Sequence, residues 1–538
     1  MGRKGTSIGQ LTRACSVVAI LAAAAPALQA QTAPTENGPM SAIDWLSDSL
    51  ADPQEFTLDE PATSTSAAVE SISVQSLDAP SPDAAGLLPP SVTGFPARLW
   101  GSAETNQIIE QIVTSPRTPL PALSALRREI LLAEAAAPEN GNGRLLLARI
   151  DKLLELGFLE DAHALLSSIE TRNADLFRRE FDIALLLGRE TEACNDIRSA
   201  GGVALSYQVR VFCLARNGDW NAAVLTLNSA DILGELNPGE YDLIARFLDP
   251  EMFEGDPDLP VPSHPSPLVY RMYEALGQPI PTRILPLAFS QADLREVTGW
   301  KLRIEAAERL GRIGAVPDNR LLGIYTERQA AASGGVWDRV KIVQNMDVAL
   351  RSGDTDAISR QLPALIEVMQ ENALQRPLAN IFAPRLTELI NPEVDGEEAT
   401  VPLVFTDESL SLIRQISLLS DTYETVPAGF SPTTPREAFL ESLAQGLPAA
   451  DTPGDPAIQA VIDGFDGAAL TAADQVLLDD GRVGELLLHA ISRFGSGTEG
   501  DLSQVTSALR LLRSLGREDT ARQAALQFLL ISENGASY

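Results

Sequence analysis

Residues suited to metal or thiol chemistry are scarce in this chain, which has three histidines and three cysteines among 538 residues. His163, His264 and His489 lie far apart in the sequence, in no H-E-x-x-H motif and with no cysteine at the spacing of a zinc site. A nucleophilic cysteine would also need a histidine close by and an exposed thiolate. The sequence therefore predicts no metal site and gives no support to thiol catalysis.

Motifs for nucleotide binding and acyl transfer are missing as well. The chain has no G-x-x-x-x-G-K-[ST] loop, no strand-borne G-x-G-x-x-G and no G-x-S-x-G. Glycoside hydrolysis needs two carboxyl groups at a fixed separation, and 73 Asp and Glu residues leave no pair that the sequence singles out. We therefore expect no catalytic residue and no cofactor, and predict a non-enzymatic protein.

Glu441-Ser442 is similar to the Glu-Ser pair of soluble lytic transglycosylases, which carry an α-superhelix before a catalytic domain. That family has a Gly-Leu-Met-Gln segment downstream of the pair. Here Gly446-Leu447-Pro448 follows at a much shorter spacing and lacks Met-Gln. We interpret Glu441 as a residue on the surface of a helix.

Cys194 and Cys213 are the cysteines outside the N-terminal apolar segment that contains Cys15. The Gly201-Gly202 turn lies near their midpoint, so on two antiparallel helices the two side chains would face each other. In an oxidising compartment this arrangement predicts a disulfide. The alternative is a pair of buried free thiols, because cysteine is often a small core residue.

The elements that must position these residues are helices, and four segments share one pattern: a Gly with an Ala five positions later. Glycine adopts the left-handed conformation that ends a helix, and the small alanine lets the next helix pack closely. Successive glycines of the first three copies are 31 and 30 residues apart. The four pairs are Gly157/Ala162, Gly188/Ala193, Gly218/Ala223 and Gly516/Ala521.

This pattern resembles degenerate tetratricopeptide (TPR) repeats, which are ~34 residues long. The resemblance covers roughly residues 144–230, with a possible last repeat at 509–530, and most consensus aromatic positions are missing. It implies an all-α chain of antiparallel helical hairpins stacked in a superhelix or solenoid, with a surface that binds protein. The alternative is a set of ordinary helical hairpins, each ended by a glycine.

Residues 1–30 have the features of a secretory signal peptide: a basic start with Arg3, Lys4 and Arg13, then an apolar run that ends at Pro26. Cleavage is expected near Ala27 or Ala30, and a retained N-terminal anchor is the alternative. We expect a periplasmic or secreted protein with no membrane span after signal removal. A formal net charge of −32 opposes nucleic-acid binding, which requires Lys and Arg to neutralise phosphates.

Residues 31–96 are predicted to be a disordered acidic arm, rich in Pro, Ser and Ala and without Lys or Arg. A short amphipathic helix is expected at 40–50, where Ile43, Leu46 and Leu50 share one face and Trp45 adds a large apolar contact. Such a segment is typical of a helix-in-groove ligand, so these four residues are candidates for partner binding. The alternative is that the segment folds back onto the solenoid.

The remaining chain shows helical periodicity and no alternating strand. A solenoid would suit its length, because each repeat buries its apolar face only on its neighbours. One helix is predicted over 292–310. We expect TPR-like repeats over 97–249, a Pro-rich loop over 250–267, a second helical-repeat half over 268–444, a linker over 445–457 and C-terminal helical hairpins over 458–535.

The sequence thus predicts an exported scaffold or adaptor that binds another protein of the cell envelope. Two alternatives stay open. One is a periplasmic chaperone or assembly factor of a motility or secretion machine. The other is a protein of cell-wall (peptidoglycan) turnover whose site has no recognisable motif.

Overall fold

The computed structural model describes residues 43, 45, 46, 81–118, 120–169, 173–199, 205–330, 332–391, 405–446 and 454–531. All of them lie in the second of the two compact units into which the chain divides, residues 40–538. Over the described residues the secondary structure is helical and no strand is present, which confirms the all-α prediction. None of the helices described combines the length and the apolar composition that crossing a membrane requires.

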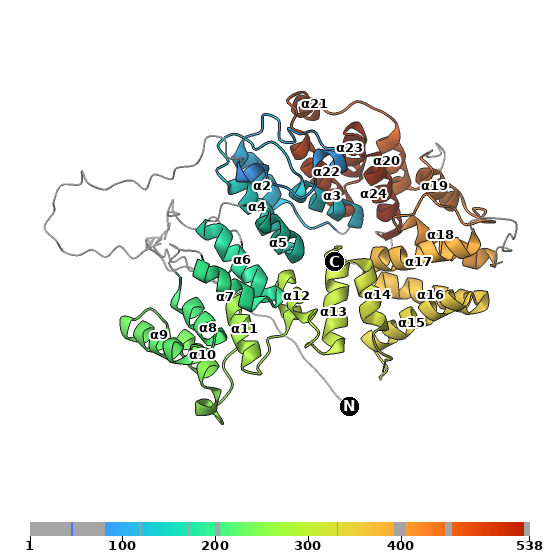
Figure 1. Ribbon diagram of the computed structural model, residues 1–538. Coiled ribbons are helices and arrows are strands. Elements are labelled where there is room, and N and C mark those ends of the chain that lie inside the picture. The colour runs from blue at the N-terminus through green and yellow to red at the C-terminus, as the bar shows by residue number, and fades with distance from the viewer. Residues whose placement is uncertain are drawn as a thin grey trace, which may run out of the picture. The chain divides into compact units, whose positions relative to one another are not determined.

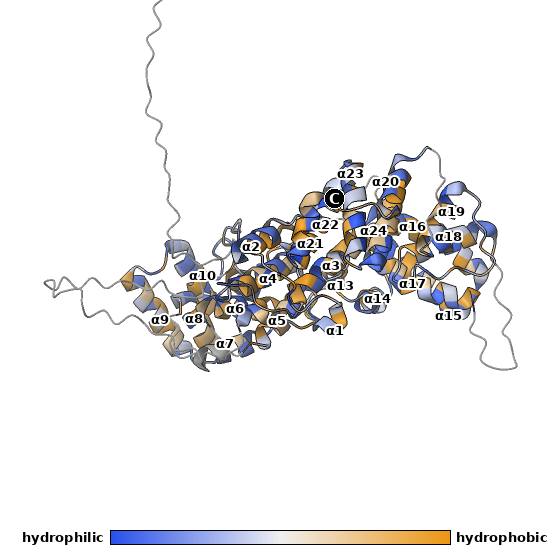
Figure 2. Cartoon of the chain, turned by 90° about the horizontal axis from the view of Figure 1, so that it is seen from above, coloured by the Kyte–Doolittle hydropathy of each residue, from blue (hydrophilic) through white to orange (hydrophobic). Residues whose placement is uncertain are grey.

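The first part of the chain forms short elements followed by helical hairpins. Figure 2 shows that most helices carry both hydrophobic and hydrophilic residues, as partly buried helices do. The elements are η2 (Pro82–Ala84), α1 (Pro90–Thr93), α2 (Thr105–Thr114), α3 (Pro121–Leu132), α4 (Arg144–Glu155), α5 (Leu159–Ser167), α6 (Ala174–Leu187), α7 (Glu190–Ser199), α8 (Tyr207–Arg216) and α9 (Trp220–Leu233).

The middle of the chain begins with α10 (Pro238–Leu248), η3 (Pro250–Phe253), α11 (Pro267–Ala275), η4 (Thr282–Ile284), η5 (Leu287–Phe289), α12 (Ser290–Asp293) and α13 (Trp300–Gly311). The helix predicted over 292–310 is thus two helices, because Gly299 before α13 has extended backbone (φ −60°, ψ 141°) and begins a new helix. Then follow α14 (Asp318–Thr326), α15 (Val336–Ser352), α16 (Thr355–Glu371), α17 (Gln375–Ile390) and α18 (Asp407–Leu418).

The C-terminal part consists of α19 (Pro435–Ala444), α20 (Pro456–Phe465), α21 (Ala472–Asp479), α22 (Val483–Thr498), α23 (Leu502–Ser514) and α24 (Glu518–Ile531). Its last hairpin, α23–α24, turns at a glycine, as do α4–α5, α6–α7 and α8–α9. The four glycines, Gly157, Gly188, Gly218 and Gly516, have φ between 73° and 85°. The alanines five positions later, Ala162, Ala193, Ala223 and Ala521, are buried.

Residues 81–96, at the end of the predicted arm, belong to the folded part. The carboxylate of Asp83 is buried and accepts hydrogen bonds from the backbone N–H groups of Gly143 (2.8 Å) and Leu146 (2.8 Å). These donors lie at the start of α4, where backbone N–H groups have no helical partner. Asp83 therefore caps α4 from a distant part of the chain.

The two ends of the described chain meet. Helix α3 packs against α24 and α22, and α2 packs against α22 (Figure 1, where the blue helices lie beside the brown ones). The backbone N–H of Ala122 donates to Gln527 Oε1 (2.8 Å), and that of Gly484 donates to the carbonyl of Leu99 (2.8 Å). The larger apolar core likewise combines residues of α3 with residues of α22 and α24.

Helix–helix contacts consequently form a closed circuit, from α3 through α4, α5, α6, α12, α13, α14, α17, α18 and α24 back to α3. An open solenoid, in which each repeat touches only its neighbours, has no such closing contact. The sequence did not predict it, because no local pattern specifies contacts between residues hundreds of positions apart.

Arg517, at the turn before α24, makes three kinds of contact with the first part of the described chain. Its guanidinium donates to the carbonyl oxygen of Thr93 (2.8 Å), pairs with Glu129 of α3, and lies over the ring of Phe95 (4.7 Å to the centroid). Four-fifths of its side chain is buried, so removing it would leave the Glu129 carboxylate without its cation in a partly desolvated place.

Replacing Arg517 by Met should therefore lower the free energy of unfolding by about 2–3 kcal/mol. Arg513→Met is a matched control, because Arg513 also pairs with a glutamate (Glu518, 2.7 Å) and lies over an aromatic ring (Phe465), but does so within the C-terminal helices. The control should cost under about 1 kcal/mol. Urea unfolding curves measure both, and equal losses would contradict the closing role of Arg517.

Candidate functional site

Three residues of the segment at 40–50 pack against other described parts of the same chain. The structure describes its residues Ile43, Trp45 and Leu46, whereas Leu50 and the others lie outside the described residues. Trp45 is 8% exposed and Leu46 5% exposed, and both belong to the larger apolar core. Trp45 lies in a turn, in which the N–H of Leu46 donates weakly to the carbonyl of Ile43 (3.5 Å).

The turn is held by an aromatic contact and a backbone hydrogen bond. The indole of Trp45 meets the ring of Phe289 edge to face (5.4 Å, 67°), and Phe289 makes the same kind of contact with Tyr270 (5.5 Å, 72°). Arg178 of α6 donates from Nη2 to the carbonyl oxygen of Leu46 (3.1 Å). An aromatic anchor combined with a contact to the peptide backbone is how proteins bind segments of other chains.

A cavity of about 590 Å³ adjoins the turn, with Ile43 and Trp45 forming part of its wall. Its other walls come from α4, the loop before α11, the segment around η4 and η5, and α13. We call this cavity, together with the site that the turn occupies, the Trp45 groove. A volume in this range suits several side chains of a bound peptide.

Three basic side chains, from different elements, line the Trp45 groove. Lys152 of α4 donates to the carbonyls of Val113 (3.2 Å) and Ser115 (2.8 Å) and to the carboxylate of Glu155 (2.9 Å). Burial lowers the pKa of Lys152, and the hydrogen bond that Lys152 donates to Glu155 opposes this shift. Arg309 and Arg117 also line the cavity.

Acidic groups of the groove are already paired. Asp151 makes a two-point contact with buried Arg179 of α6, whose Nη2 lies 2.7 Å from Oδ2. Burial raises the pKa of Asp151, and the hydrogen bonds from Arg179 oppose that shift. Arg179 neutralises Asp151, so Glu155 is the remaining carboxylate of the lining. It faces three cations, Lys152, Arg117 and Arg309, and this excess of positive charge favours an acidic ligand.

The carboxylates of a second cavity, about 510 Å³ between α20, α21 and α23, are also engaged in structural contacts. Asp474 accepts two hydrogen bonds from Arg493 (2.7 and 2.8 Å) and one from Thr471 (2.8 Å). The hydrogen bonds from Arg493 lower the pKa of Asp474 against the opposing effect of burial. A carboxylate stabilised in its ionised form is a poor proton donor at neutral pH, which disfavours glycoside hydrolysis by this residue.

The three histidines lie on separate elements. His163 is on α5, His264 is in the loop before α11 beside the Trp45 groove, and His489 is on α22. Over the described parts of the chain, no three His, Cys, Asp or Glu side chains are grouped as metal ligands would be.

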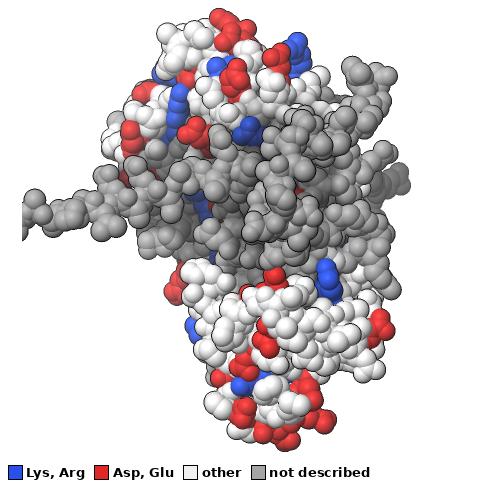
Figure 3. Space-filling view, turned by 90° about the vertical axis from the view of Figure 1, so that its left-hand side faces the viewer, with Lys and Arg blue, Asp and Glu red and all other residues white. Residues whose placement is uncertain are grey.

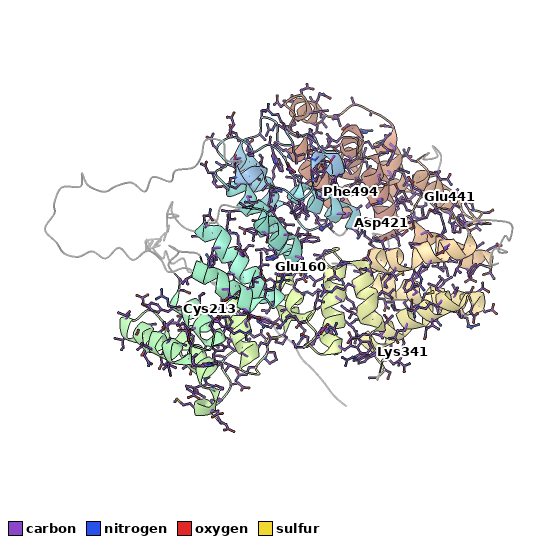
Figure 4. All side chains as sticks on the ribbon, viewed as in Figure 1. Glu160, Cys213, Lys341, Asp421, Glu441 and Phe494 are labelled. Carbon is purple, nitrogen blue, oxygen red and sulfur yellow. A yellow bond between two sulfur atoms is a disulfide. The ribbon has the colours of Figure 1, made fainter. Side chains whose placement is uncertain are left out.

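Cys194 of α7 and Cys213 of α8 form a disulfide, with sulfur atoms 1.99 Å apart and Cα atoms 5.2 Å apart (Figure 4, where Cys213 is labelled). The pair thus lies at the disulfide distance that the sequence predicted. Both residues are buried, and the bond ties together two successive hairpins. The predicted turn at Gly201-Gly202 lies outside the described residues.

Helix α9 presents apolar side chains to solvent. Leu225 is 68% exposed and Ile232 is 84% exposed, on the side of α9 opposite its buried residues Ala223 and Ala230. Figure 3 looks at the side of the molecule on which α9 and α10 lie, and much of the surface below the grey residues is uncharged there. Exposed apolar surface of this kind is typical of protein-binding faces.

Comparison with known proteins gives no match: no family model fits the chain, and no curated protein or solved structure is significantly similar to it. The interpretation therefore depends on the geometry of the site.

Sequence analysis selected Trp45 and Leu46 but missed the residues that hold them, Phe289 and Arg178. These partners are far from the turn in the sequence, Arg178 by 132 positions, so no spacing rule connects them. In the sequence, Phe289 is an aromatic residue in an apolar stretch and Arg178 is an arginine in a predicted helix. Neither feature marks a residue as part of a binding site.

The disulfide should stabilise α7 and α8 against local unfolding. Replacing both Cys194 and Cys213 by Ala removes a link with a sequence separation of 19 and should cost about 3 kcal/mol in the chain-entropy model. Amide hydrogen exchange in α8 measures the loss. Dithiothreitol should accelerate exchange in the wild type alone, and an equal acceleration in the variant would contradict this assignment.

Replacing Trp45 by Ala should release the turn. Because Phe289 then loses one of its two aromatic partners and keeps Tyr270, amides of residues 284–293 should exchange at least about tenfold faster, as loss of about 1.4 kcal/mol of local stability implies. Trp220→Ala is the control, since Trp220 is half exposed on α9. Unchanged exchange at 284–293 in the Trp45 variant would show that the turn does not dock there.

Proposed function

We propose that the protein is an exported, non-catalytic helical scaffold or adaptor that binds another protein of the cell envelope in the Trp45 groove. The observation that carries the proposal is the occupied groove itself. A turn of this chain is held there by the ring of Phe289 and by a hydrogen bond from Arg178 to a backbone carbonyl. A segment of another protein with the same features would fit the same contacts.

The helical arrangement supports a scaffold. We propose that the hairpins α4–α5, α6–α7 and α8–α9 are degenerate TPR-like repeats, since each helix from α4 to α9 packs on the next and each hairpin turns at a glycine. TPR-like arrays usually bind extended or helical segments of other proteins.

Export is part of the proposal. The N-terminal 30 residues have signal-peptide features, with cleavage proposed near Ala27 or Ala30. The buried disulfide supports this assignment, because such bonds persist mainly in oxidising compartments such as the periplasm or the extracellular medium.

The partner segment is proposed to be acidic and to contain a tryptophan followed by an aliphatic residue. The residues that the structure describes in the groove, Ile43, Trp45 and Leu46, belong to the sequence Ile-Asp-Trp-Leu. The groove has three cations, Lys152, Arg117 and Arg309, for one remaining carboxylate, Glu155, and this excess of positive charge complements acidic residues in such a segment.

A labelled peptide with the sequence of residues 40–50 provides the test. Fluorescence anisotropy should show that it binds the Trp45→Ala variant, whose groove is empty, and that it binds wild type at least about tenfold more weakly, because a tethered segment competes at high effective concentration. A peptide with Ala in place of Trp is the matched control and should not bind. Equal binding of both peptides, or of neither, would contradict the groove as a peptide site.

Crosslinking in periplasmic extracts then tests the partner. A protein whose capture is displaced by the 40–50 peptide, and increases with the Trp45→Ala variant, would support binding in the groove. Loss of capture with that variant would instead make the 40–50 segment itself the ligand of a partner. Retention on purified cell-wall glycan that the peptide does not displace would favour a role in cell-wall turnover and contradict the adaptor.

A further inference from the structure

Exposed apolar side chains are concentrated on α9. Among the described residues thirteen large apolar side chains are exposed, and five of them lie on this helix of 14 residues, whereas the others are spread over the rest of the chain. Single exposed apolar residues are normal on a protein surface, but a cluster of them marks a site of interaction. The five, which are between 45% and 84% exposed, are Trp220, Val224, Leu225, Ile232 and Leu233.

The position of α9 in the fold leaves this side open. Helix α9 packs on α8 and α10, and its buried side consists of Ala223, Leu227 and Ala230. Figure 1 shows α9 at the outer edge of the molecule, with α8 and α10 beside it. Leu225 and Ile232 are seven residues apart, so they lie on one side of the helix, two turns from each other. The helix is about 21 Å long, which allows another helix to lie along it.

Acidic residues border the exposed apolar side chains at both ends of α9. Asp219 directly precedes Trp220 at the start of the helix. Asp231 directly precedes Ile232 in the last turn, and Glu235 follows just after the helix ends. All three acidic residues are exposed. A ligand on the apolar side of α9 would therefore meet negative charge at each end.

The region around α9 is acidic as a whole. From the start of α8 to residue 258 it contains ten Asp and Glu residues and three arginines, which gives a formal net charge of −7. Two of the arginines already have acidic neighbours, since Arg216 lies 3.8 Å from Glu190 and Arg246 lies 3.2 Å from Asp242, and Arg210 lies over an aromatic ring of its own helix. Figure 3 shows acidic side chains around uncharged surface on this side of the molecule.

This charge distinguishes between the possible occupants of the α9 surface. A second copy of the chain would bring acids against acids, because a two-fold contact joins the same surface of both copies. Residues 47–80, which lie outside the described residues, contain acids and no Lys or Arg. An anionic lipid surface attracts Lys and Arg and would repel this region. A protein partner with an apolar side and basic flanks is complementary in both respects.

We propose that α9 binds a basic amphipathic helix of another protein. Aliphatic side chains on one side of that helix would pack on Leu225 and Ile232, and Lys or Arg at its borders would face Asp219 and Asp231. The surface shares no residue with the lining of the Trp45 groove, so this inference does not depend on the proposed adaptor function. The two sites would select partners of opposite charge.

Fluorescence anisotropy with a labelled model helix tests the surface on the full chain. The probe is a peptide of leucine and lysine as long as α9 (14 residues), with leucine at helical spacing i, i+3, i+4 and i+7. One control peptide has the same composition with leucine spread around the helix, and the other has Glu in place of Lys. The probe should bind at least about tenfold more tightly than either control, and added salt should weaken its binding. Equal binding of the probe and the scrambled peptide, or no binding, would overturn the proposal.

Substitutions on α9 then locate the binding. Combining Leu225→Ser with Ile232→Ser should lower the affinity for the probe at least about tenfold, while the fold should be preserved because both side chains are exposed. Val297→Ser is the matched control, since Val297 is 82% exposed in the segment before α13, and it should leave the affinity unchanged. Asp231→Lys should weaken binding several-fold through charge alone. Unchanged affinity in the double variant, or an equal loss in the control, would contradict binding at α9.

The other occupants are tested with the same double variant. Sedimentation velocity measures self-association, flotation with vesicles that contain phosphatidylglycerol measures lipid binding, and a labelled peptide of residues 47–80 measures docking of the chain's own segment. None of these is expected to change between wild type and the double variant. Self-association, vesicle binding or binding of the 47–80 peptide that the double variant abolishes would identify that occupant instead and overturn the proposal.

Discussion

The contact between α3 and α24 is the constraint on which the rest of this fold depends. It joins the two ends of the described chain through a shared apolar core, and through an arginine that reaches from the turn before α24 to the carbonyl of Thr93 and the carboxylate of Glu129. A linear array of helical hairpins leaves its terminal repeats exposed, with one apolar face each to protect. Closing the circuit buries these faces against each other.

This closure also positions the candidate site. Helix α4, which supplies Lys152 to the Trp45 groove, packs on α2 and α3; α2 packs on α22, and α3 packs on α22 and α24. Asp83 fixes the start of α4 by accepting two of its free N–H groups. The opposite wall, around η5 and α12, contacts α4 and α6. Each of these elements is thus held in place by contacts with other elements. This favours a binding site that is already formed before a ligand binds.

The sequence predicted what local chemistry determines. Helical periodicity indicated the all-α fold, and the Gly-x4-Ala spacing marked turns at which Gly157 and Gly516, for example, have positive φ. A turn between two cysteines placed Cys194 opposite Cys213. Each of these features depends on residues within about 20 positions of one another.

Contacts across the chain could not be predicted in this way. Arg517 meets Thr93 at a separation of 424 residues, and the composition around either residue does not mark the pair. The same holds for Trp45 and Phe289. Side chains that complete the sites are therefore specified by tertiary packing and not by motif.

Native-state hydrogen exchange, followed in α3 and α24 at increasing urea concentration, would test the closed circuit most directly. If the circuit is closed as described, the slowest amides of the two helices should share one opening free energy and one urea dependence, because neither helix can leave without exposing the core of the other. If α24 opens at a clearly lower free energy while α3 stays protected, the ends behave as independent terminal repeats and the account is contradicted.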